Sequence, residues 1–194
     1  MLREIVNQLF APMIYLRINH SAKTHFDITI PLTLTALSSI IFFYIDALSK
    51  MEQFDSILKN TLAFIYILPG FYITALSAIA ALGQGNLDDP MPAPAPTLTE
   101  SMYYDDQIST SKLSRRRFLG LLFAYLSALS FLLAILGSLA LTANTHLSTS
   151  TAGSIFRSST LPVFYFFTWQ LMTVTFLGLY YLGYKLLKPE FKRD

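Results

Sequence analysis

Apolar residues fill four long stretches of this chain, and polar residues collect in the segments between them. The stretches cover residues 28–48, 62–82, 118–143 and 161–184. Each has more than 20 residues, and a helix needs about 20 residues to cross the hydrocarbon core of a bilayer. Asp46, near the end of the first stretch, is the only charged residue in any of them. The pattern predicts an all-α integral membrane protein with four transmembrane helices.

The alternative is a soluble bundle of four buried helices. Helices in such a bundle keep a polar stripe on the face toward water, whereas these stretches have almost none. The composition also favours a membrane protein, because 53% of the residues are hydrophobic and 13% are charged, about half the charged share of a soluble domain. The lead before the first stretch contains acids and histidines, so we do not expect a cleaved signal peptide.

The basic residues are unevenly distributed, which predicts the orientation in the membrane. All but three of the 14 lysines and arginines lie in the N-terminal lead, between the second and third stretches, or in the C-terminal tail. The exceptions are Lys50, Lys59 and Arg157. Because basic residues concentrate in cytoplasmic loops, we expect both termini and the central segment to be cytoplasmic. Residues 144–160, rich in Ser and Thr, would then form an outward-facing loop.

The chain accordingly divides into five segments. They are a cytoplasmic or interfacial N-terminal segment (1–27), a first transmembrane hairpin (28–82), a cytoplasmic linker and docking loop (83–117), a second transmembrane hairpin (118–184) and a basic cytoplasmic tail (185–194). In the first segment apolar residues recur at helical spacing, and Pro12 is expected to kink or end that helix. An amphipathic helix lying at the inner membrane interface fits this pattern; a helix that binds a partner protein is the alternative.

The central segment, residues 83–117, is far longer than the reversal of a helical hairpin requires. Alternate prolines from Pro90 to Pro96 favour a stiff polyproline II arm, and Thr99 is expected to begin a short helix. The helix would present paired tyrosines and acids that suit a partner interface. These predicted partner-binding residues are Tyr103, Tyr104, Asp105 and Asp106. A disordered hydrophilic tether is the competing interpretation.

The third stretch and the residues before it have two further predicted roles. Arg115, Arg116 and Arg117 are expected to anchor the third helix at anionic lipid headgroups, with nucleic-acid binding as the alternative. Small residues four apart let membrane helices approach closely, and they form two stripes on this helix. The stripes are Gly120, Ala124 and Ala128, and Ser130, Ala134 and Ser138. They serve either packing inside the bundle or contact with a second copy of the chain.

The pattern assembles no catalytic or metal site. The chain has no cysteine, and His20, His25 and His146 do not form the cluster of ligands that a metal site needs. Asp46 is expected to pair with Lys50, four residues further on. We therefore expect a protein that is not an enzyme, with no cofactor, no metal and no direct nucleic-acid partner.

Over most of its length the chain resembles the KwaA family, the membrane subunits of the bacterial Kiwa anti-phage defence system. The resemblance lies in the size, the four helices, the cytoplasmic termini and the extended central cytoplasmic loop. It implies a homo-oligomer in the bacterial inner membrane that works with KwaB, a soluble cytoplasmic effector that binds DNA. It also implies that the pair senses infection at the membrane and blocks phage propagation. No motif aligns position by position, so the resemblance assigns no functional residue.

Three classes of function follow from these observations. The first is an oligomeric sensor and scaffold that recruits a cytoplasmic effector through the central segment. The second is a pore-forming or holin-like effector that permeabilises the membrane. The third is an integral membrane enzyme, which would require ionisable residues within the bilayer. A pore does not need a long cytoplasmic segment, and this favours the sensor and scaffold.

Overall fold

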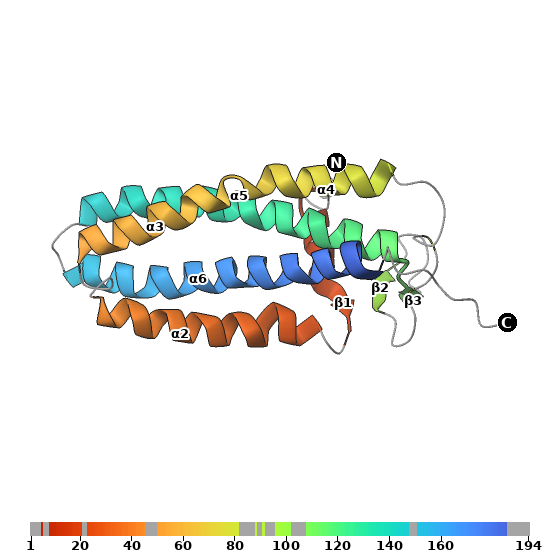
Figure 1. Cartoon of the computed structure of the whole chain (residues 1–194), viewed down its shortest axis with the longest axis horizontal. Helices are drawn as coiled ribbons and strands as arrows, with labels where there is room; N and C mark the ends of the chain where they lie inside the picture. Colours follow the sequence, from red (N-terminus) through yellow and green to blue (C-terminus); the bar gives the residue numbers. More distant parts are fainter. Residues whose placement is uncertain are drawn as a thin grey trace.

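Four helical rods lie side by side, in the order α2, α6, α5 and then α3 with α4, and a small sheet sits at one end (Figure 1). The computed structural model describes residues 5, 8–20, 23–45, 50–81, 88, 91, 96–101, 108–147 and 151–185, and of residues 99–101, 108–110 and 184–185 the backbone alone. As predicted, four helices are long and apolar enough to cross a membrane. The structure is that of a multi-pass membrane protein, and we call the end that carries the sheet the sheet end.

The first span, His25–Tyr44, begins before the apolar stretch that predicted it. It consists of a π-helical turn, η2 (His25–Thr29), and helix α2 (Ile30–Tyr44). Helix α2 packs chiefly against α6: the Trp169 indole N–H donates to the Ser38 hydroxyl over 3.0 Å. Because the helix starts early, Asp27 lies inside the span rather than in the preceding lead.

The second span also begins earlier than predicted, at Met51. It consists of α3 (Met51–Ile65) and α4 (Leu68–Ala81), parted at residues 66–67. The break comes just before Pro69, whose ring excludes the carbonyl of residue 65 and removes a backbone donor. The residues of α3 that are buried share one face, and they are Phe54, Leu58, Leu62 and Ile65. The polar residues between them lower the hydropathy of this part, which is why it was not predicted as helix.

The third and fourth spans are α5 (Arg115–Leu147) and α6 (Thr151–Leu179), which continues as a π-helical turn η3 (Tyr180–Lys185). The predicted bounds of the loop over residues 144–160 are therefore wrong, because only 148–150 lie between the helices. Ser and Thr hydroxyls in this helical part are satisfied by carbonyls of the preceding turn. The Ser159 hydroxyl, for example, donates to the carbonyl of Ile155 over 2.9 Å.

The sheet corrects two further predictions. Three antiparallel strands pair in the order β1 (Ile18–Asn19), β2 (Thr97–Ser101) and β3 (Ile108–Lys112). The chain is therefore not all-α, and Thr99 lies in a strand instead of beginning a helix. The alternation of Thr, Leu, Ile and Ser over both strands, with β-branched residues well represented, explains this preference. The central segment thus contains a β-hairpin, which we call the hairpin.

In the N-terminal segment the described residues before Pro12 agree with the predicted helix that Pro12 ends, because residues 5, 8 and 9 are α-helical and exposed. Residues Ala11–Arg17 form the 3-10 helix η1, with Pro12 in its first turn, and Ile18 enters β1. The η1 helix packs against α5 (Figure 1). Its Tyr15 side chain is completely buried and Ile18 is nearly so. This segment belongs to the core of the bundle at the sheet end.

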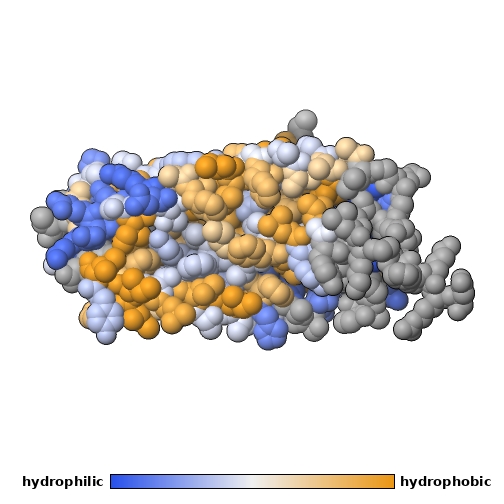
Figure 2. Space-filling model, viewed as in Figure 1, coloured by the Kyte–Doolittle hydropathy of each residue, from blue (hydrophilic) through white to orange (hydrophobic). Residues whose placement is uncertain are grey.

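The outer surface of the bundle is apolar over its middle. Figure 2 shows hydrophobic residues across the centre of the viewed face and hydrophilic residues at the end opposite the sheet. Large aliphatic and aromatic side chains on α2, α5 and α6 are more than half exposed, among them Leu37, Phe43, Ile135 and Val163. Because lipid tails are as apolar as these side chains, such a belt is what a membrane-spanning bundle presents to the bilayer.

Candidate functional site

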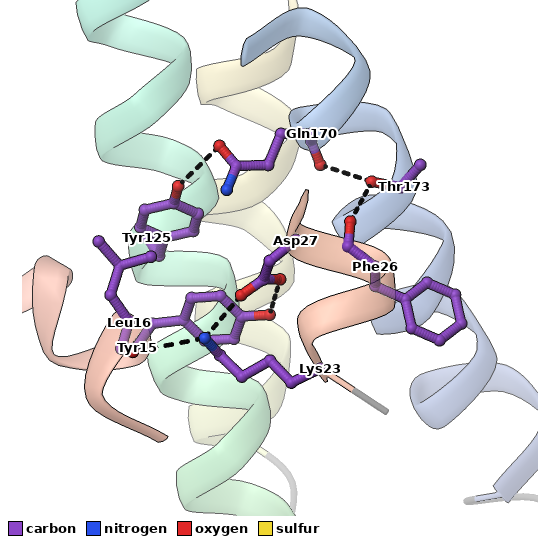
Figure 3. A network of polar contacts seen from close by, with 8 residues as sticks. All are labelled: Tyr15, Leu16, Lys23, Phe26, Asp27, Tyr125, Gln170 and Thr173. Carbon is purple, nitrogen blue, oxygen red and sulfur yellow. Dashed lines mark hydrogen bonds and ion pairs between the residues drawn. The ribbon is translucent and has the colours of Figure 1, made fainter. Parts of the chain in front are cut away.

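A buried ion pair joins the N-terminal segment to the first span (Figure 3). The Lys23 ammonium lies 2.6 Å from one carboxylate oxygen of Asp27, one helical turn further on. The other oxygen of Asp27 accepts a hydrogen bond from the Tyr15 hydroxyl over 3.0 Å. Asp27 is only 4% exposed. We call these three residues the polar cluster.

Two further interactions concern Tyr15 and Lys23 of the polar cluster. The Lys23 ammonium also lies 4.7 Å from the centroid of the Tyr15 ring, within the range of a cation–π interaction. Burial raises the pKa of the Tyr15 hydroxyl above its ordinary value, and the negative charge of Asp27 raises it further. The phenol therefore stays protonated and can donate to the carboxylate. Each polar group of the cluster has a partner, as a buried group requires.

The polar cluster is surrounded by polar contacts from two further spans. The Tyr15 ring stacks on Tyr125 of α5, with ring centroids 4.9 Å apart. The Tyr125 hydroxyl in turn donates to the side-chain carbonyl of Gln170 on α6 over 3.1 Å. On the same helix, the Thr173 hydroxyl donates to the backbone carbonyl of Phe26 over 2.7 Å. Three spans and the N-terminal segment therefore meet at this point (Figure 3).

This meeting point lies within the spans. Tyr125 is ten residues into α5, which places its Cα about 15 Å along the helix from Arg115. Polar groups at such depth are expensive unless they satisfy one another. A network of side-chain hydrogen bonds of this kind has few alternative arrangements, and this fixes the position of η1 against the bundle.

The polar cluster is connected directly to the hairpin. Ile18 follows the buried Tyr15 by three positions, and it pairs with Leu98 of β2. A hydrogen bond also closes the base of the hairpin. The backbone N–H of Leu113, just after β3, donates to the carbonyl of Pro96, just before β2, over 3.1 Å. The side chains of Leu98 and Leu113 are fully buried. The hairpin is thus attached to the bundle through packed residues at its base.

The predicted partner-binding residues Tyr103, Tyr104, Asp105 and Asp106 lie outside the described residues. They belong to the connection between β2 and β3. The predicted polyproline arm also falls largely outside them. Within it, Met91 is 5% exposed and its backbone N–H donates to the carbonyl of Leu113 over 3.2 Å.

The three predicted anchor residues, Arg115, Arg116 and Arg117, form the first turn of α5. Arg116 makes a two-point contact with the carboxylate of Asp88, over 2.9 Å and 3.4 Å. A fork of this kind fixes the relative orientation of guanidinium and carboxylate. Arg116 is therefore tied to the central segment, and Arg117 is exposed at the bundle end.

The two predicted stripes of small residues have different surroundings. The stripe Ser130, Ala134 and Ser138 faces the other helices: Ser130 is fully buried, and the Ser138 hydroxyl lies 2.9 Å from that of Tyr66. The stripe Gly120, Ala124 and Ala128 is half-buried, and an added Cβ at Gly120 would have no atom within 4 Å.

One close helix contact involves a glycine that neither stripe contains. A Cβ built on Gly137 of α5 would lie 2.6 Å from a methyl of Leu62 and 2.9 Å from the ring of Phe164. A side chain there has no space, so Gly137 allows α5 to approach both α3 and α6 closely.

A second buried polar group lies at the end opposite the sheet. The Asn144 side chain donates to Asp55 over 2.9 Å and accepts from the guanidinium of Arg157 over 3.1 Å. Asn144 is fully buried and Arg157 is 3% exposed. The amide links a cation on α6 to an anion on α3, so it joins three spans. We call these three residues the amide bridge.

Sequence reasoning missed both groups because it made the helices too short. Asp27, Asp55 and Arg157 fell outside the predicted apolar stretches, whereas the structure places them inside the spans. A signal was present, because Lys23 with Asp27 and Asp55 with Lys59 are opposite charges four residues apart, the spacing of helix neighbours. Among the described residues, no three side chains of the His, Asp or Glu type come together as metal ligands.

No protein-family model, curated protein or solved structure matches the chain. Assignment of function therefore depends on the polar cluster, the hairpin and the resemblance in overall pattern.

Proposed function

We propose that the protein is an oligomeric inner-membrane sensor and scaffold of an antiviral defence system, a KwaA-like subunit. In this proposal it detects infection at the membrane and recruits a soluble, DNA-binding cytoplasmic effector of the KwaB kind. The observation that supports it is the pairing of β1 with β2. This pairing connects the hairpin to Tyr15, and Tyr15 is connected to three spans.

The connection supplies a route from the membrane to the hairpin. A change in how α2, α5 and α6 pack would alter the contacts that Asp27, Tyr125 and Thr173 make. Tyr15 and Ile18 would respond, since both are buried against the bundle. A coupled change of this type needs an element that can take two arrangements, and the short pairing of β1 is our candidate for that element.

Oligomer formation is part of the proposal, and the stripe Gly120, Ala124 and Ala128 is its support. Small residues at a half-open helix face allow a second helix to approach closely. The stripe is at the sheet end of α5, so neighbouring subunits would bring their hairpins close together. Several hairpins would then offer an effector more than one contact.

The proposed orientation places the sheet end in the cytoplasm, and this is tested by reporter fusions. We expect a reporter fused after Asp194, or inserted in the 102–107 connection, to be active in the cytoplasm. A reporter inserted after Thr149 is expected to be active in the periplasm, because basic residues are concentrated at the other end. Periplasmic activity of the 102–107 insertion would overturn the orientation.

The recruitment step is tested on the connection between β2 and β3, residues 102–107, to which we give the name hairpin tip. We expect the double substitution Tyr103→Ala and Tyr104→Ala to abolish capture of the effector from native membranes and to remove protection against phage. Interface energy concentrates in a few residues, with aromatic ones prominent, each contributing about 2 kcal/mol or more. Capture is measured by pull-down of the tagged protein and identification of what it retains.

The matched control is Tyr44→Ala, which removes a tyrosine that is 81% exposed at the far end of α2. It is expected to leave capture and protection unchanged, and all variants should insert and assemble as wild type. If the double variant captures the effector and protects cells like wild type, the hairpin tip is not the docking surface.

A further inference from the structure

A cavity of about 400 Å³ opens beside the polar cluster at the sheet end. Its wall comes from five parts of the chain. They include Phe26 of η2, Pro96 at the start of the hairpin, Phe118 of α5, Leu177 of α6 and Tyr181 of η3. The volume is within the range of about 300–1,000 Å³ that small-molecule sites usually have. The cavity is distinct from the groove between α5 and α6 near Val163 at the opposite half of the bundle.

The wall favours a hydrocarbon occupant. Nearly all of its surface belongs to aromatic and aliphatic groups. A polar ligand would lose its bonds to water there and find few replacements, which disfavours it. A flexible apolar chain has no hydrogen bonds to water to lose, and the removal of its apolar surface from water favours binding.

The cavity opens on the outer face of the bundle. Phe176, on its rim, is 66% exposed, and Tyr180 is 48% exposed. These residues belong to the last part of the fourth span, Thr151–Gly183. Tyrosines at such a position lie at the level of lipid headgroups. The cavity is therefore reached from the boundary between headgroups and acyl chains.

The polar side of the cavity carries Lys23 and His20. The Lys23 ammonium there is paired with Asp27. Around them, among the described residues of the sheet end, basic residues outnumber acidic ones. The basic residues with described side chains are Arg17, Lys23, Lys112, Arg115, Arg116 and Arg117, and the acidic ones are Asp27 and Asp88. A phosphate at the mouth of the cavity would lie in an attractive potential.

We infer that this cavity binds one phospholipid of the surrounding leaflet, with an acyl chain against Phe118 and Leu177 and the phosphate on the side of Lys23 and His20. The bilayer itself supplies this ligand at high concentration. Because Pro96 precedes β2 and Lys23 belongs to the polar cluster, the bound lipid would touch both the hairpin and the ion pair. The inference is independent of effector recruitment and holds for a scaffold with any partner.

The test uses a phospholipid that carries a photoactivatable diazirine in its acyl chain, added to the full-length protein in mixed vesicles. We expect saturable cross-linking at Phe118 and at residues 176–181, mapped by mass spectrometry, and its loss under excess unlabelled phospholipid. A diacylglycerol with the same diazirine has no phosphate and is expected to label these residues less. Labelling spread evenly over the exposed faces of all spans, and not competed, would overturn the inference.

The variant test fills the cavity. Leu177→Trp is expected to remove the saturable labelling and to lose the one lipid that wild type retains in native mass spectrometry after detergent exchange. The control Leu136→Trp places the same bulk on the other groove, at a residue that is 50% exposed, and should retain both. Equal lipid retention by Leu177→Trp and wild type would overturn the inference. The competition experiment on wild type remains decisive if that variant does not fold.

Discussion

Replacing Lys23 with methionine is expected to lower the free energy of unfolding by about 3–5 kcal/mol, because it leaves the Asp27 carboxylate buried without its cation. Asp27 is 4% exposed and has the ammonium of Lys23 at 2.6 Å. The double substitution Lys23→Met with Asp27→Leu removes both charges. It should recover most of the loss, since apolar replacement of a buried ion pair is often close to neutral. Unfolding is followed in mild detergent through the fluorescence of Trp169.

The chain contains a matched control for this experiment. Asp55 and Lys59 have the same spacing, but their closest charged atoms are 4.0 Å apart and the Lys59 side chain is 65% exposed. Lys59→Met is therefore expected to change the free energy of unfolding by no more than about 0.5 kcal/mol. A loss in Lys23→Met no larger than in Lys59→Met would show that the Lys23–Asp27 pair does not hold the N-terminal segment.

The same variants test the connection to the hairpin. If Tyr15 and Ile18 transmit the state of the polar cluster, Lys23→Met should speed hydrogen exchange at the β2 amides that pair with β1. Exchange in the middle of α5 should change much less, because that helix keeps its own backbone bonds. The double variant Lys23→Met with Asp27→Leu lacks both charges, so it separates the effect of charge from that of packing. If its β2 amides exchange as slowly as in wild type, packing alone positions the hairpin.

Replacing Asn144 with alanine is the second change with a large expected effect. It removes the amide bridge and with it two hydrogen bonds to charged groups, on Asp55 and on Arg157. Each such bond contributes about 1.5–3 kcal/mol, and the Arg157 guanidinium then lies in a buried space without the amide. We expect a drop in the free energy of unfolding at the upper end of that range or above it, measured as for Lys23→Met.

Thr145→Ala is the control for the amide bridge. Thr145 is the next residue, its side chain is exposed, and its hydroxyl donates only to the carbonyl of Thr142 in the described structure. Its removal should change stability by no more than about 0.5 kcal/mol. A similar stability of Asn144→Ala and Thr145→Ala would mean that Asp55 and Arg157 are satisfied in another way, and that the amide bridge does not join the three spans.

The two polar groups have different places in the proposed function. The amide bridge lies at the end opposite the sheet and joins α3, α5 and α6. The polar cluster joins the N-terminal segment to α2, α5 and α6 near the hairpin. We expect Asn144→Ala to lower the stability of the bundle as a whole. Substitutions in the polar cluster are expected to act more strongly on the hairpin and therefore on effector recruitment.

Several features of the fold were predictable because each depends on residues close together in the sequence. A run of more than 20 apolar residues predicts a spanning helix, since a helix satisfies all of the run's backbone hydrogen bonds inside the bilayer. The break before Pro69 also follows from one residue and its neighbours. The proposed orientation is of the same kind, because it depends only on where the basic residues lie along the chain.

Other features depended on which distant segments pack together. Local patterns in the sequence do not show these contacts. Thr99 was expected in a helix, but it pairs with Thr110 in a strand, and Ile18, far away in the chain, pairs with Leu98 beside it. Strand pairing is decided by tertiary context more than by local preference. The burial of Tyr15 has the same origin, since its partners Asp27 and Tyr125 belong to two different spans.

The sequence by itself determined that the protein has four membrane-spanning helices, because the hydrophobic effect acts on each apolar run separately. Only the tertiary structure decided how long those helices are and which polar residues they bury. Arg157 and Asp55 can lie within helices because Asn144 forms a hydrogen bond with each of them. Asp27 can lie within a span because Lys23 and Tyr15 are its partners. A buried charge is stable only with its partner, and the partner is chosen by the fold.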